Sequence, residues 1–86
     1  MSENIPVETR LMIHRIVRQI CMKIWGFVGP MGVLAQEFAY RYFEALRSGD
    51  EALQKDVVDV YKSFGLDEKV IKEIKKLLDE RYGKKS

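Results

Sequence analysis

The chain has few of the residues on which most enzymes depend for catalysis. Its 86 residues include one cysteine, Cys21, and one histidine, His14. A single cysteine excludes a disulfide within the chain, so the fold must be stable without covalent cross-links. Free thiols are typical of proteins in reducing compartments, and we therefore predict a cytoplasmic location.

The two residues also lie too far apart to act together. His14 and Cys21 are seven residues apart, which on a helix separates them by two turns, or about 10.5 Å. A zinc ion needs each ligand atom within about 2.3 Å of itself. The di-iron sites of helical bundles need Glu three residues before His, and Leu11 stands there. We predict no catalytic residue, no cofactor, no metal site and no small-molecule substrate, so the chain is not expected to be an enzyme.

Long hydrophobic runs are missing as well. The longest stretch without a charged residue, 24–36, has 13 residues and contains three glycines and Pro30. A helix needs about 20 apolar residues to cross a bilayer, so no membrane span is predicted. The first nine residues include Glu3 and Glu8 and do not form the basic and apolar segments of a secretory signal.

Amide side chains are scarce, whereas charged ones are abundant. Asn, Gln and Thr number five in total, while charged residues make up 33% of the chain. This balance is found in heat-adapted proteins, and we predict a thermophilic source. The net charge of +2 is too small to indicate a polyanionic partner by itself. The hydrophobic share of 47% suits one globular domain.

Four segments have the apolar periodicity of helices, and glycine or proline separates them. They predict helices at about 6–27, 31–47, 51–64 and 68–82, and no segment alternates as a strand would. Because the Gly/Pro connections are short, sequential helices should be neighbours. The expected fold is a single all-α domain over 1–86, a compact four-helix arrangement.

The connections carry recognisable capping residues. Ser48 or Asp50 is placed to cap the third helix, and Asp67 to cap the fourth. Gly65 stands where a left-handed residue ends a helix, with Leu66 as its hydrophobic contact. The three glycines of 26–32 are similar in spacing to phosphate-binding loops, but no strand precedes them and no Lys-Ser/Thr follows, which favours an interhelical turn.

Apolar stripes indicate which residues should form the core. The predicted first helix has one face made by Ile13, Ile16, Val17, Ile20, Ile24, Phe27 and Val28. The stripes of the third and fourth helices converge on Gly65. We therefore expect six of their residues to pack together as one corner: Val57, Tyr61, Phe64, Ile71, Ile74 and Leu78.

The same two segments place apolar residues around a glycine turn at positions Val60, Phe64, Leu66, Ile71 and Ile74. In this spacing 57–76 resembles the helix-turn-helix pattern of DNA-binding repressors, which implies that the second helix would read DNA. Two departures weaken the resemblance. Tyr61 stands where the motif has a small residue, and the helix that would read DNA begins with Asp67 and Glu68, which phosphates would repel.

The first helix is apolar on two sides. Opposite its core face, at 100° per residue, lie six residues that we predict to form an interaction face: Val7, Leu11, Arg15, Arg18, Met22 and Trp25. Trp, Met and Arg are enriched at protein interfaces. Two alternatives remain: the helix is central, with both faces in the core, or the basic face lies on a membrane surface.

Arginine and lysine are divided between the two halves of the chain. Residues 1–47 hold five arginines and one lysine, whereas 48–86 hold eight lysines and one arginine. Because arginine is the cation preferred at interfaces, the first half of the chain should contact a partner, whereas the lysine-rich second half should face solvent. We predict a non-enzymatic interaction module, a homodimer or a subunit bound to another protein, with Arg15 and Arg18 close to Glu8 of the facing chain. The alternative is a small nucleic-acid-binding protein that uses 57–76 or the arginine-rich first helix.

Overall fold

The fold is all-α, as predicted from the sequence. The computed structural model describes residues 5–83, and these form four helices with no strand among them. The helices are α1 (Val7–Trp25), α2 (Pro30–Ser48), α3 (Glu51–Ser63) and α4 (Glu68–Tyr82). The described part measures 35 × 28 × 25 Å along its principal axes.

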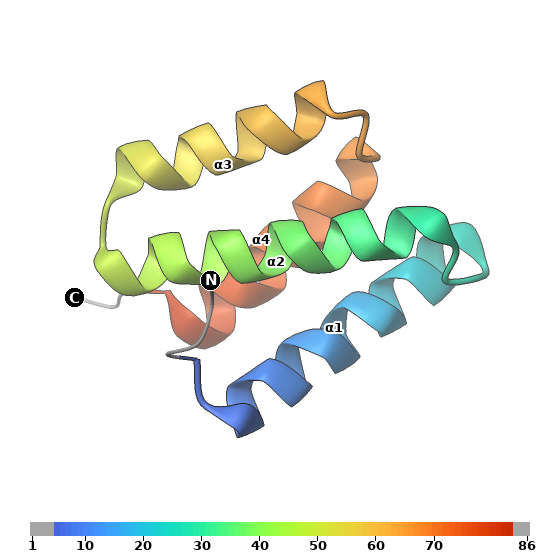
Figure 1. Ribbon diagram of the computed structural model, residues 1–86, viewed down its shortest axis with the longest axis horizontal. Helices are drawn as coiled ribbons and strands as arrows, with labels where there is room; N and C mark the ends of the chain where they lie inside the picture. Colours follow the sequence, from blue (N-terminus) through green and yellow to red (C-terminus); the bar gives the residue numbers. More distant parts are fainter. Residues whose placement is uncertain (1–4, 84–86) are drawn as a thin grey trace.

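Helix α2 is the central element of the domain. It contacts all three other helices, while α1 and α4 also pack against each other and α3 meets α4 only slightly. In Figure 1, α2 crosses in front of α4, with α3 along one side and α1 along the other. The connections α1–α2 and α3–α4 both lie at the same end of the molecule, which brings two turns together there.

The predicted end of the first helix was two residues too late. α1 ends at Trp25 because Gly26 adopts a left-handed conformation (φ 83°) and donates its N–H to the Met22 carbonyl at 3.0 Å. Phe27 and Val28 therefore belong to the turn and are exposed, not part of the core face. α2 in turn begins at Pro30, where the missing N–H costs nothing in the first turn.

The second half of the chain is capped as the sequence indicated. Asp50, and not Ser48, accepts the Leu53 N–H at 3.0 Å and caps α3, and Asp67 accepts the Lys69 N–H at 2.8 Å at the start of α4. Gly65 is left-handed (φ 94°). The N–H of Leu66 then reaches back to the Tyr61 carbonyl at 3.1 Å and completes the C-terminal cap of α3.

The core lies between α1, α2 and α4. On α1, the residues Ile13, Ile16, Val17 and Ile20 are buried as predicted, and Ile24 is partly buried. The largest fully buried side chains of the core come from all three helices: Tyr42, Phe38, Ile13, Ile74, Leu78, Val17 and Val70. Every buried side-chain polar atom among the described residues has a hydrogen-bond partner.

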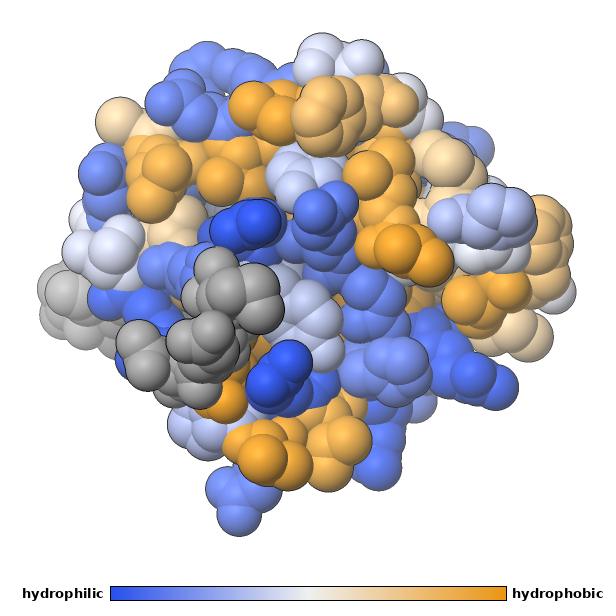
Figure 2. Space-filling model, viewed as in Figure 1, coloured by the Kyte–Doolittle hydropathy of each residue, from blue (hydrophilic) through white to orange (hydrophobic). Residues whose placement is uncertain are grey.

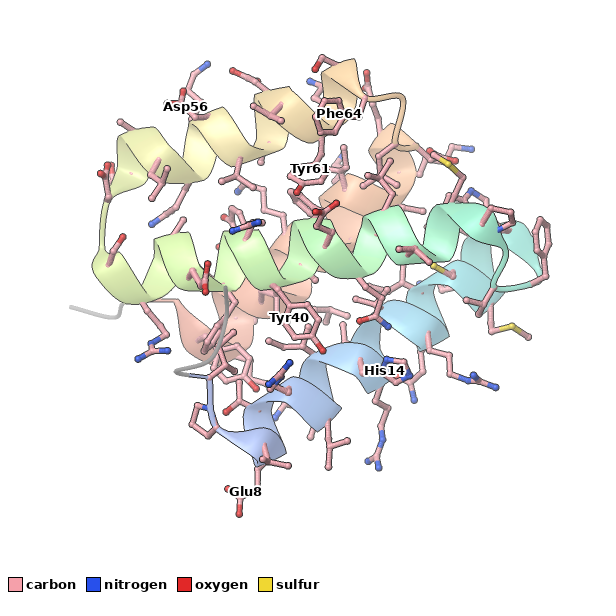
Figure 3. The ribbon with its side chains drawn as sticks, in the orientation of Figure 1. Glu8, His14, Tyr40, Asp56, Tyr61 and Phe64 are labelled. Atoms are coloured by element: carbon pink, nitrogen blue, oxygen red, sulfur yellow. The ribbon has the colours of Figure 1, made fainter. Side chains whose placement is uncertain are left out.

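The predicted corner between α3 and α4 was wrong in its packing. Phe64 is 60% exposed, and only Tyr61 of α3 is buried. Tyr61 points from α3 toward α2 (Figure 3) and packs against Phe38, with ring centroids 5.6 Å apart. The stripe predicted for α3 was right only at the buried Tyr61 and the half-buried Val57, and α3 packs chiefly on α2 rather than on α4. Periodicity defines a helix face and leaves its neighbour undefined.

Candidate interaction surface

The outer face of α1 combines exposed apolar side chains with exposed arginines. Val7, Leu11 and Met22 are 69%, 62% and 49% exposed, and Arg15 and Arg18 between them are also exposed. Neither guanidinium has an ion-pair partner within residues 5–83. The structure therefore places five of the six predicted residues on one solvent-facing surface of one helix.

Trp25, the sixth residue, is held differently from the other five. Its ring is partly buried against the core, and its indole nitrogen donates a 3.0 Å hydrogen bond to an oxygen of Asp67. The bond joins the last residue of α1 to the residue that caps α4. Trp25 thus presents only part of its ring to solvent, and its position at the surface is fixed.

A second, more apolar surface begins where the outer face of α1 ends. The two turns that meet at one end of the molecule enclose a shallow groove of about 550 Å³. In Figure 2, apolar side chains gather at this end and also along α3. The groove is lined by Ile24, Trp25, Phe27, Gly29, Pro30, Met31, Gly65 and Asp67.

Sequence reasoning missed this groove because it assigned Phe27 to the core face of the first helix. Phe27 is instead 59% exposed. Its ring lies so close to Gly29 that a Cβ on that glycine would come within 2.6 Å of a ring carbon. Similarly, Val28 lies over the buried Gly32. The Gly-x-x-Gly spacing, which allows both side chains to fold back on the backbone, was the signal that could have revealed the turn.

Asp67 is the only charged residue among the described residues that line the groove. The Trp25 indole N–H and the Lys69 backbone N–H both donate to its carboxylate, and these bonds hold the pKa of Asp67 below its ordinary value. The groove therefore has apolar walls and a negative charge at one edge. This chemistry suits a positively charged side chain with an apolar stem.

A second shallow depression, of about 600 Å³, lies on α1 immediately before the groove. It is lined by Arg15, Arg18, Gln19, Met22 and Lys23. Lys23 lies 3.9 Å from the Glu73 carboxylate of α4, a weak and solvent-exposed ion pair. Positive charge thus surrounds Met22, while the negative charge of Asp67 lies beyond Trp25.

The histidine and the cysteine occupy different environments. Cys21 is fully buried, and burial raises the pKa of its thiol. His14 is exposed, with the Gln36 amide nitrogen 2.6 Å from its Nδ1 atom. Within the described ranges, no group of three or more His, Cys, Asp and Glu side chains is placed to hold a metal ion.

The helices α3 and α4 do not form a compact pair. Val60 is 44% exposed and Phe64 is exposed too, although the helix-turn-helix pattern would bury both between its two helices. Leu66, Ile71 and Ile74 are buried. From Gly65 onward α4 runs behind α2 and away from α3 (Figure 1), so α4 does not cover Val60 and Phe64.

No protein-family model matches the chain, and no curated protein or solved structure shows significant similarity to it. Among residues 5–83, no helix is both long enough and apolar enough to span a membrane. The geometry and chemistry of the surface are therefore the basis for assigning a function.

Proposed function

We propose that this protein is a non-enzymatic helical interaction module that self-associates through the outer face of α1 and the adjoining groove. One observation carries the proposal. Large apolar side chains at the end of α1, in the turn that follows it and at the start of α2, namely Met22, Phe27, Val28 and Met31, remain exposed. Soluble monomers seldom expose a contiguous apolar surface, and burial against a second copy is the commonest way to cover one.

The arrangement of charge supports a protein partner. Arg15 and Arg18 are exposed among the apolar residues and lack ion-pair partners within the described part of the chain. Arginine accepts desolvation more readily than lysine, because its planar cation is weakly hydrated and pairs with carboxylates through two bonds. Apolar anchors combined with arginine are the composition of binding hot spots.

Sedimentation across concentration tests the proposal directly. We expect the parent chain to form dimers in the micromolar range and Met22→Glu to remain a folded monomer, because the new charge would lie at the centre of the buried contact. Met22 is 49% exposed in one copy, so the substitution should leave the helical circular dichroism unchanged. If the parent sediments as a monomer up to about millimolar concentration, the proposal is contradicted. At that concentration, only a dimer with a binding free energy weaker than about 4 kcal/mol would escape detection.

Binding of nucleic acid is the second candidate, supported by the three cations Arg15, Arg18 and Lys23 around the α1 depression. Salt separates the two functions. Binding through several phosphates should weaken steeply between about 50 and 200 mM salt. Association through apolar contacts should persist or strengthen under the same change.

A further inference from the structure

The most informative contrast on the surface is between two charges that lie on either side of Met22. Arg18 is exposed and lacks an ion pair within residues 5–83. Asp67 accepts two hydrogen bonds from this chain and is attracted by the charge of Lys69, but no cation lies within ion-pair distance of it among the described residues. A contact that brings Arg18 to Asp67 would give Arg18 an ion-pair partner and Asp67 a closer cation.

The two groups cannot meet within one copy by a small adjustment. Arg18 precedes Met22 by four residues, about 6 Å along the axis of α1, and Trp25 follows Met22 by three, about 4.5 Å. Asp67 is hydrogen-bonded to Trp25 and so lies at the far end of this interval. The separation of roughly 10 Å along the axis keeps the two charges apart.

A second copy in antiparallel orientation removes this separation. If a two-fold axis passes close to Met22, residues at equal distances on either side of Met22 face each other across the interface. Arg18 of each copy then faces Trp25 of the other, because 18 and 25 are almost equidistant from 22. Arg18 and Trp25 are also seven residues apart and therefore project within about 20° of each other on α1.

We propose that the chain forms an antiparallel two-fold dimer centred on Met22, in which Arg18 of each copy enters the groove of the other. The stem of Arg18 lies along Trp25 and Phe27, and its guanidinium binds the Asp67 carboxylate. This inference rests on the self-association proposed above and adds the register and the partner residue. Each groove is incomplete until the other copy supplies its arginine.

Three features favour this register over other ways of pairing α1. It places Met22, an adaptable apolar side chain, on the symmetry axis. It keeps the two copies of Arg18 apart, since they lie on opposite sides of the axis. It also combines the guanidinium with the face of an indole and a carboxylate, two attractive interactions in one partly desolvated groove.

The prediction from the sequence placed Arg15 and Arg18 close to Glu8 of the facing chain, without fixing a register. A pairing of Arg15 with Glu8 needs an axis near residue 11 or 12, halfway between 8 and 15. Leu11 would then lie at the centre, and the groove beside Trp25 would remain uncovered. Leu11 and Met22 are both exposed apolar residues of the same helix face, so they form a matched pair for distinguishing the two registers.

The first experiment compares Met22→Glu with Leu11→Glu by sedimentation equilibrium. The proposed register predicts that Met22→Glu abolishes the dimer and that Leu11→Glu changes the dissociation constant less than about threefold, a small effect at an uncovered position. Circular dichroism confirms that both variants are folded. If Leu11→Glu weakens the dimer as much as Met22→Glu, or more, the register is wrong.

The second experiment measures the coupling between Arg18 and Asp67. Arg18→Gln and Asp67→Asn should each weaken the dimer about tenfold or more, and the double variant by little more than either alone, because both remove one contact. Asn keeps one acceptor oxygen for the cap of α4, so α4 should remain intact, but its NH2 group cannot also accept the Trp25 N–H. Trp25→Phe, which removes only that bond's donor, shows how much of the weakening comes from its loss. Lys76→Gln, which removes an exposed positive charge on α4, is the control for net charge and should have little effect.

Trp25, the only tryptophan in the chain, gives an independent optical reading of the groove. Its emission should shift to longer wavelength on dilution, with the same midpoint as sedimentation, and the shift should be absent from monomeric Met22→Glu. A parent that never associates overturns both this inference and the proposed function. A parent that associates but shows multiplicative effects of Arg18→Gln and Asp67→Asn overturns only the inference.

Discussion

The indole nitrogen of Trp25 donates a 3.0 Å hydrogen bond to the carboxylate of Asp67, 42 residues further along the chain. The other carboxylate oxygen of Asp67 accepts the Lys69 N–H at the start of α4. One side chain therefore caps α4 and fixes the end of α1 beside it. The groove between the two turns keeps its shape because this link spans it.

The link should make part of the stability sensitive to acid. The Trp25 N–H, and after it the Lys69 N–H, lower the pKa of Asp67 in the folded state. The ionised carboxylate therefore contributes its full share of folding stability above the ordinary pKa of about 3.8. This stability is lost as the pH falls through the lowered pKa. In Trp25→Phe the pKa of Asp67 should move up toward that ordinary value. Carboxyl-carbon NMR titration of the two proteins measures this shift, and superimposable curves would contradict it.

Tyr42 should produce the opposite dependence in alkali. Burial, and then its 2.7 Å hydrogen bond to the Asp79 carboxylate, raise the pKa of Tyr42 well above its ordinary value of 10.0. A raised pKa stabilises the fold below about pH 10, and this contribution is lost as the pH rises further. Urea unfolding between pH 9 and 12 should therefore show a steeper loss in the parent than in Tyr42→Phe.

At neutral pH, the same Tyr42→Phe variant should be less stable by about 1 to 3 kcal/mol, the usual effect of losing a hydrogen bond to a charged group. Lys75, 3.1 Å from the other oxygen of Asp79, still solvates that carboxylate and should keep the loss within this range. Equal stability of the two proteins at pH 7 would show that solvent replaces the bond fully.

Two substitutions distinguish the core from the exposed end of α3. Ile74 is completely buried, so Ile74→Ala should lower the free energy of unfolding by about 2–5 kcal/mol. Phe64 is 60% exposed and contacts mainly the edge of Tyr61, so Phe64→Ala should cost about 1 kcal/mol or less. Chemical denaturation of both variants tests this order. A larger loss of unfolding free energy for Phe64→Ala than for Ile74→Ala would support the packing of Phe64 in the corner that the sequence predicted.

Gly29→Ala should alter the groove while leaving the fold intact. The new Cβ would come within 2.6 Å of the Phe27 ring, but that ring is exposed and can rotate away, and the backbone of Gly29 is extended with φ −106°. We expect a change of less than about 1 kcal/mol in unfolding and a measurable weakening of the dimer. Thermal melting together with sedimentation tests the two effects separately, and an unchanged dimer would mean that the ring position does not matter.

Much of the fold could be read from the sequence because local signals and packing agree. Asp50, Gly65 and Asp67 mark helix ends through backbone chemistry that acts within three or four residues, and all three do so in the structure. The end of α1 was harder to predict. Phe27 continues the apolar period of the helix, and the period gave no indication that Gly26 would turn the chain first.

The candidate surface could be predicted only in part. Leu11, Arg15, Arg18 and Met22 follow from helical phase alone, since α1 has a single buried face. The groove depends on two turns that are distant in the sequence, and no local rule places Asp67 beside Trp25. That contact is set by the way α1 and α4 pack against α2, which periodicity does not define.

The one-sided attachment of α3 has a consequence for local unfolding. α3 contributes one buried side chain, Tyr61, and packs chiefly on α2, whereas α1, α2 and α4 share the main core. We expect a helix held mainly by a single neighbour to open as a separate cooperative unit while the remainder stays folded. Backbone amides of α3 should then exchange with deuterium earlier than those of the three-helix unit, which makes that unit the structure that persists to global unfolding.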